Sequence, residues 1–80
     1  MITISGTLTI QDNNGQQHTI NANELHCERN LTQGEEYDVS YDTGDWSVQC
    51  TVENKDGAGI SSNDWEENNC TIVNDGISFS

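Results

Sequence analysis

Acidic side chains are the residues of this chain with the clearest chemical potential, because they far outnumber the basic ones. The 80 residues include fourteen Asp and Glu against only Arg29 and Lys55, which gives a formal net charge of −12 at pH 7. Binding to nucleic-acid phosphates or to anionic membrane surfaces requires clustered Lys and Arg. The composition therefore excludes direct nucleic-acid binding through a basic patch, disfavours binding to anionic membrane surfaces, and favours cations or basic proteins as partners.

Several of these carboxylates lie in a stretch where polar and apolar residues alternate. Asp38, Ser40 and Asp42 fall on the polar face of that stretch, and every second residue of a strand is spaced by about 6.6–6.8 Å. Such a ridge imitates a phosphate backbone and could occupy the basic groove of a nucleic-acid-binding protein. The predicted partner-binding residues are Glu35, Glu36, Asp38, Asp42, Asp45 and Glu53.

The function predicted from this ridge is that of a non-enzymatic nucleic-acid mimic or inhibitor, for example of the anti-restriction or anti-CRISPR type. The simpler alternative is a solvated acidic surface that only keeps a small protein in solution. A carbohydrate-binding β module is a third alternative, which rests on exposed aromatic residues such as Trp65. The oligomeric state does not follow from the sequence.

Cysteine and histidine residues do not form a catalytic pair in this sequence. His26 and Cys27 are adjacent, so on a strand they point to opposite faces and cannot act as nucleophile and base. Cys27, Cys50 and Cys70 lack the closely spaced ligand pairs of structural zinc sites. The first residues show neither the basic start nor the apolar run of a signal peptide. We therefore predict a cytoplasmic protein that is not an enzyme, with three free and mostly buried thiols.

Two alternating strands joined by a turn are predicted at the centre of the chain. Side chains alternate across a strand with period two. Tyr37, Val39 and Tyr41 fall on one face of the first run, and the apolar residues from Trp46 to Val52 fall on one face of the second. The segment 42–45 between them has turn chemistry.

The other segments also read as short strands and turns. A long first strand ends before the Asn14-Gly15 turn, and a second strand follows through Ile20, with a bulge or a strand end near Asn23. We expect a loop over 29–36, a turn over 54–57, a strand near Ile60, one helical turn over 62–67 and a last hairpin around 74–76. Residues 45–61 and 64–78 echo each other, which predicts two similar strand–turn–strand units.

The predicted fold class is all-β, with one domain over residues 1–80. We expect a small antiparallel β-sandwich or flattened barrel of about six strands built from hairpins, with Greek-key connections as one option. The predicted core comprises Ile2, Ile4, Leu8, Ile10, Ile20, Leu25, Tyr37, Val39, Tyr41, Trp46, Val48, Cys50, Val52, Ile72, Ile77 and Phe79.

A resemblance adds an alternative function. Residues 34–46, reading G-E-E-Y-D-V-S-Y-D-T-G-D-W, resemble the opening strand of a βγ-crystallin Greek key, and 74–78, reading N-D-G-I-S, resemble the calcium motif of that family. The likeness spans residues 34–78, with Val48 where the family has Gly and Phe79 where it has Ser. It implies a calcium-binding Greek-key module in which Asn74, Asp75 and Ser78 lie near the cation. Otherwise no cofactor is expected.

Overall fold

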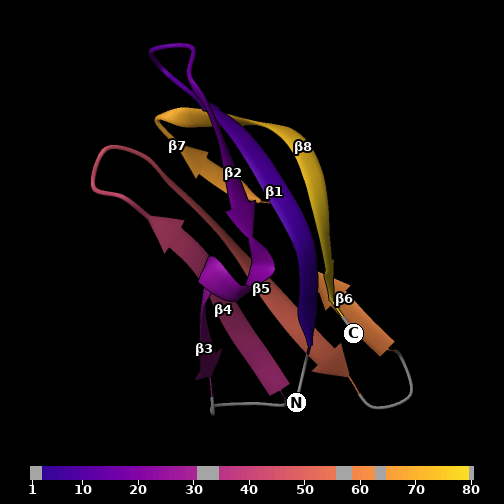
Figure 1. Cartoon of the computed structure of the whole chain (residues 1–80). Helices are drawn as coiled ribbons and strands as arrows, with labels where there is room; N and C mark the ends of the chain where they lie inside the picture. Colours follow the sequence, from indigo (N-terminus) through magenta and orange to yellow (C-terminus); the bar gives the residue numbers. More distant parts are fainter. Residues whose placement is uncertain (1–2, 31–34, 56–58, 63–64, 80) are drawn as a thin grey trace.

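The computed structural model describes residues 3–30, 35–55, 59–62 and 65–79 (Figure 1). Its elements are β1 (Ile4–Asp12), β2 (Gln17–Asn21), the 3-10 helix η1 (Ala22–Glu24), β3 (His26–Asn30), β4 (Glu35–Asp42), β5 (Ser47–Lys55), β6 (Gly59–Ser62), β7 (Glu66–Asn68) and β8 (Cys70–Phe79). All strand pairs are antiparallel. The predicted all-β sandwich is confirmed. No helix among the described residues is long and apolar enough to cross a membrane.

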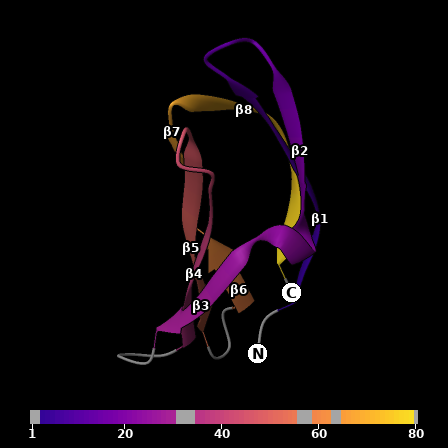
Figure 2. The same ribbon diagram turned by 60° about the vertical axis from the view of Figure 1, so that its left-hand side comes forward.

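Two sheets form the layers of the sandwich, as Figure 2 shows in side view. Sheet A has the order β2-β1-β8, so the first and last strands of the chain lie side by side. Sheet B has the order β3-β4-β5-β6, and β7 pairs with the beginning of β5 on the edge that β6 occupies further along. The chain passes from sheet A to sheet B through η1 and returns through the corner at Asn69, whose φ is +60°.

The core fills the space between the two sheets with the residues that alternation singles out. The buried members are Leu8, Ile10, Ile20, Leu25, Tyr37, Val39, Trp46, Val48, Cys50 and Val52, all of which were predicted. Ile4, Tyr41, Trp65, Ile72, Ile77 and Phe79 are partly buried against this cluster. Ile2 lies outside the described residues. Strand alternation therefore places the residues that alternate with these core positions on the outside of the sandwich.

The predicted hairpin around 74–76 is wrong, because β8 runs unbroken through these residues. Gly76 is needed there for close packing and not for a turn, since a Cβ at this position would lie 2.8 Å from the backbone oxygen of Thr7. The register against β1 shifts between Thr9 and Ile10, so that Val73 is an extra residue on β8. Without that turn, the two strand–turn–strand units expected from the echo do not match in structure.

Two further local predictions are wrong and one is partly wrong. The helical turn over 62–67 is not formed, because Ser62 ends β6 and Glu66 begins β7. The loop over 29–36 is too long, because Arg29 and Asn30 belong to β3 and pair with Tyr37 and Glu36 of β4. Of the three thiols expected to be mostly buried, Cys50 is buried, Cys70 is half-buried and Cys27 is exposed.

Candidate interaction face

The outer face of sheet B gathers carboxylates from four strands. In β4 and β5 the buried residues Val39, Cys50 and Val52 point into the core, so the residues that alternate with them point outward. Directly opposed residues of neighbouring strands share a face, which extends the surface to β3 and β7. We call this surface the acidic face; its carboxylates are Glu28, Glu36, Asp38, Asp42, Glu53 and Glu66.

Like charges face each other directly on this surface. Glu28 of β3 lies opposite Asp38 of β4, and Glu36 of β4 lies opposite Glu53 of β5. Opposed like charges destabilise an antiparallel pair, on the scale of about 0.2–1 kcal/mol. Of the four, Glu28 and Asp38 are exposed, and Glu36 and Glu53 are half-buried. The exposed pair of Glu28 and Asp38 therefore works against folding, and packing does not explain it.

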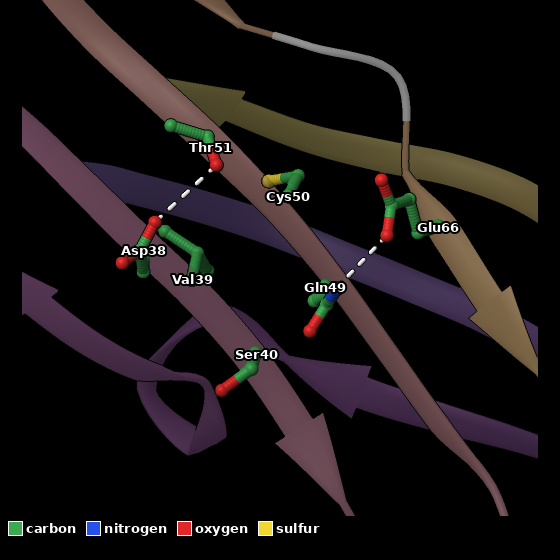
Figure 3. A pocket seen from close by; sticks show the side chains of 7 residues that line it. All are labelled: Asp38, Val39, Ser40, Gln49, Cys50, Thr51 and Glu66. Carbon is green, nitrogen blue, oxygen red and sulfur yellow. Dashed lines mark hydrogen bonds between the residues drawn. The ribbon is translucent and has the colours of Figure 1, made fainter.

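A trough of about 310 Å³ crosses the middle of the acidic face between β4, β5 and β7. Figure 3 shows its two hydrogen bonds: the Thr51 hydroxyl donates to Asp38 Oδ1 at 3.3 Å, and Gln49 Nε2 donates to Glu66 Oε2 at 2.9 Å. Ser40 completes the polar lining. These bonds hold both carboxylates at the surface, where they can accept further hydrogen bonds from a cationic group.

The structure brings four of the six predicted partner-binding residues together, namely Glu36, Asp38, Asp42 and Glu53. Asp45 is exposed in the turn between β4 and β5, where its N–H donates to Thr43 Oγ1 at 3.2 Å. Glu35 pairs with Asn54, at a position that alternates with Glu36, and its side chain lies outside the described residues.

Two members of the acidic face were missed from the sequence. The sequence places neither residue on a strand, because a bulge or strand end is expected near Asn23, ahead of Glu28, and 62–67 is typical of a helical turn. Both join the face only through register, Glu28 opposite Asp38 and Glu66 opposite Gln49. The alternation of His26 and Glu28 with Cys27 is the signal that could have extended β3.

The outer face of sheet A is uncharged in the part of the chain that the structure describes. We call it the neutral face; it consists of Ser5, Thr7, Thr9, Gln11, Gln17, Thr19, Asn21, Thr71, Asn74, Gly76 and Ser78. Its hydroxyls contact one another across strands, as between Thr9 and Thr19 at 3.4 Å. The charge of the molecule is therefore distributed unevenly between its two broad surfaces.

The residues of the calcium alternative do not converge on one side of β8. Asn74 and Ser78 pair with Thr9 and Ser5 on the neutral face. Asp75 lies opposite the buried Leu8, and its Oδ1 accepts the N–H of Ile77 at 3.1 Å. Among the described residues, no cluster of His, Cys, Asp and Glu is suited to hold a metal ion. Calcium binding by these residues stays a prediction.

The thiols lie in surroundings that keep them protonated. Burial, together with the nearby Asp75 and Cys27, raises the pKa of Cys50 to about 12. Desolvation likewise raises the pKa of Cys27, and it raises that of Cys70. Because the thiolate is the reactive form, these side chains are poor nucleophiles at neutral pH.

A polar hollow lies at the other end of the sandwich, where the β1–β2 turn approaches Trp46. His18 stacks on Trp46 with ring centroids 5.3 Å apart and bonds Asp12 Oδ2 through Nε2 at 2.9 Å. The bond to His18, with N–H groups of Gln16 and Asn14, lowers the pKa of Asp12 against a smaller desolvation effect. These contacts fix the turn to the opposite sheet.

Comparisons of the chain with protein-family models, with curated proteins and with solved structures give no match. The function is therefore inferred from the residues and their arrangement alone.

Proposed function

We propose that this chain is a non-enzymatic acidic binding protein whose acidic face occupies the basic surface of a nucleic-acid-handling protein. The observation that carries the proposal is the concentration of six carboxylates on one outer face, against an uncharged face on the other sheet. A general need for a charged surface does not account for this difference, because it would place carboxylates on both sheets.

An opposed pair on the acidic face supports the same function. Glu28 and Asp38, directly opposite each other on β3 and β4, repel each other in the free protein. A partner that inserts Lys or Arg beside these carboxylates would relieve this repulsion. The repulsion that destabilises the free protein would then be absent from the complex, which favours binding. The trough beside Asp38 and Glu66 offers acceptors for an arginine fork, which matches carboxylates with two parallel hydrogen bonds.

The spacing of the carboxylates favours a partner that normally binds phosphates. Along β4 the positions of Glu36 and Asp38 are separated by about 6.6–6.8 Å, and neighbouring strands lie about 4.7–4.9 Å apart. The face therefore presents regular rows of negative charge on a rigid sheet, as a phosphate backbone does. Such surfaces steer basic partners, which makes association fast and sensitive to salt. An inhibitor of the anti-restriction or anti-CRISPR type would use these properties.

Competition against nucleic acid tests the proposal. The immobilised chain should retain proteins from a cell lysate at low salt, and both duplex DNA and rising salt should release them. The variant Glu36→Gln/Asp38→Asn should retain much less protein. The matched control Gln11→Lys/Ser78→Lys changes the net charge by the same two units on the neutral face and should retain as much as the wild type.

Two outcomes would contradict the proposal. Retention that neither DNA nor salt reverses would mean that the partner surface is not a phosphate-binding one. Equal loss in both double variants would mean that net charge matters and that the acidic face has no special role.

A further inference from the structure

The β1–β2 turn contains two neighbouring residues that can react with each other. Of the Asn residues in the sequence, only Asn14 is followed by Gly. In such a pair the glycine nitrogen can attack the side-chain carbonyl carbon of the asparagine, because glycine has no Cβ to hinder the approach. Both residues are exposed, and a Cβ on Gly15 would meet no atom of the described residues within 4 Å, its chain neighbours aside. Packing therefore does not shield this pair from solvent.

We infer that Asn14 is a site of spontaneous deamidation whose rate is set by Asp12, through the hydrogen bonds that hold the β1–β2 turn closed. In the reaction the Gly15 nitrogen loses its proton to solvent and forms a bond to Asn14 Cγ, and the Cγ–Nδ2 bond breaks to release ammonia. Water then opens one of the two C–N bonds of the resulting succinimide ring and leaves an aspartate or an isoaspartate. The reaction consumes only water, so it occurs in the chain by itself.

Asp12 bonds three consecutive amides of this turn. Its Oδ1 accepts the N–H of Asn14 at 2.9 Å and the N–H of Gln16 at 3.0 Å. Its backbone carbonyl accepts the N–H of Gly15 at 3.0 Å. An Asp side chain that bonds the backbone two residues further on stabilises a turn. The Gly15 nitrogen must leave its bond to Asp12 before it can attack Asn14 Cγ, so the closed turn protects the amide.

Asp12 is itself held in place from the other side. Its Oδ2 lies 2.9 Å from His18 Nε2, and its side chain is only 13 % exposed. The His18 ring stacks on Trp46, with ring centroids 5.3 Å apart. Side-chain contacts with β2 and with the opposite sheet therefore support the carboxylate that closes the turn.

The sequence Asp75-Gly76 can form the same ring but lies in a different setting. β8 pairs with β1 on both sides of it, and a Cβ on Gly76 would lie 2.8 Å from the backbone oxygen of Thr7. Asp75 Oδ1 also accepts the N–H of Ile77 at 3.1 Å. Reaction there requires two long strands to separate, whereas the β1–β2 turn needs only a local opening. The structure therefore favours Asn14 as the reactive position.

Deamidation would change the hollow that Asn14 lines together with Asp12, Asp45, His18 and Trp46. The product places a new carboxylate beside those of Asp12 and Asp45, and isoaspartate also lengthens the main chain of the turn. Like charges repel at close range, so the attachment of the turn to Trp46 should weaken. Asn14→Asp reproduces the added charge and should lower the Tm at low salt. An unchanged Tm would overturn this consequence.

Mass spectrometry of the incubated chain tests the site and the role of Asp12. At mildly alkaline pH the mass increase from amide to carboxyl should map, after digestion, to the peptide that contains Asn14. The folded wild type should react roughly tenfold or more slowly than the chain unfolded in urea, because the closed turn withholds the attacking nitrogen.

Two variants of equal charge separate the turn from its surroundings. Asp12→Ala should raise the rate in the folded protein roughly fivefold, which is the usual effect of losing a capping carboxylate on the population of a closed turn. The matched control Asp45→Ala removes a carboxylate from the same hollow without altering the β1–β2 turn. It should react at the rate of the wild type.

Four results would overturn the inference. Deamidation that maps chiefly to another Asn would mean that Asn14 is not the reactive site. Equal rates in folded and unfolded wild type would mean that the turn does not protect it, and equal rates in the two charge variants would remove the role of Asp12. Val39→Ala weakens the buried core in the middle of β4, so an acceleration as large as that of Asp12→Ala would mean that global unfolding sets the rate. None of these measurements uses a partner, so their outcome is independent of the proposed function.

Discussion

The neutral face of sheet A and the acidic face of sheet B both lie on antiparallel strands, and the main difference between them is their charge. The neutral face consists of hydroxyl, amide and glycine residues, whereas the acidic face places Glu28 against Asp38 and Glu36 against Glu53. Sheet A shows that uncharged polar residues suffice for the outside of this fold. The carboxylates of sheet B are therefore a feature that folding does not require, which is why we connect them with binding.

The largest expected effect concerns the backbone of sheet A. Gly6 has a φ of +93°, and a Cβ there would lie 2.0 Å from the backbone oxygen of Gly76. Gly6→Ala should lower the free energy of unfolding by about 2–4 kcal/mol, because the clash adds to the backbone strain. Urea denaturation measures this. Ser78→Ala, on the same face, should change stability by less than about 0.5 kcal/mol. An unchanged free energy of unfolding for Gly6→Ala would mean that β1 and β8 are not so close at this position.

A smaller effect on stability is expected from removing a like-charge pair on the acidic face or introducing one on the neutral face. Asp38→Asn keeps an oxygen for the Thr51 hydroxyl and removes the charge opposite Glu28, so it should stabilise the fold by about 0.2–1 kcal/mol at low salt. The double variant Thr9→Glu/Thr19→Glu should show an unfavourable coupling of similar size in a double-mutant cycle on sheet A. Salt should reduce both effects. Destabilisation by Asp38→Asn at low salt would argue against repulsion on the acidic face.

Low pH should reduce the stability of the protein through Asp12, which lies at the end of β1. Its pKa is lowered in the folded protein, chiefly by the hydrogen bond to His18. The resulting stabilisation is present above the pKa of the unfolded state and is lost as the pH falls through the folded pKa. Asp12→Asn should therefore flatten the acid side of a plot of stability against pH. An unchanged acid side in this variant would show that the Asp12–His18 contact does not contribute.

The smallest effect is expected from calcium. Asn74 and Ser78 lie on the neutral face, and Asp75 already accepts the Ile77 N–H, so we expect calcium and magnesium to raise the thermal midpoint equally through screening. Thermal melts with each ion at equal concentration measure this. A shift specific to calcium that Asp75→Asn abolishes would instead support the calcium-binding alternative.

The alternation of polar and apolar residues correctly predicts which residues form the core, whereas the turn-type residues at 74–76 wrongly predict a hairpin. Val39, Val48 and Val52 could be placed in the core because side chains on a strand alternate whatever its neighbours are. The Asn74-Asp75-Gly76 segment has turn chemistry, but pairing along the whole of β1 and the close approach of Gly76 to Thr7 keep it extended. Local preference was overridden there by long-range pairing.

The acidic face could be predicted only in part for the same reason. Glu36, Asp38 and Asp42 lie on one strand, so their spacing is readable from the sequence. Glu28 and Glu66 join them through the registers of β3 and β7, and the charge-free neutral face depends on which strands pair with β1. Such information is carried by tertiary contacts and not by any one segment.

The most direct test of the account is to map the contact surface of a partner on this chain. A basic protein that is captured at low salt and released by duplex DNA would be titrated into isotopically labelled chain, and the amide signals followed by nuclear magnetic resonance. The account predicts that the signals that shift belong to the outward residues of sheet B around Glu36, Asp38 and Glu66. Shifts concentrated on the neutral face, or spread evenly over both sheets, would contradict it.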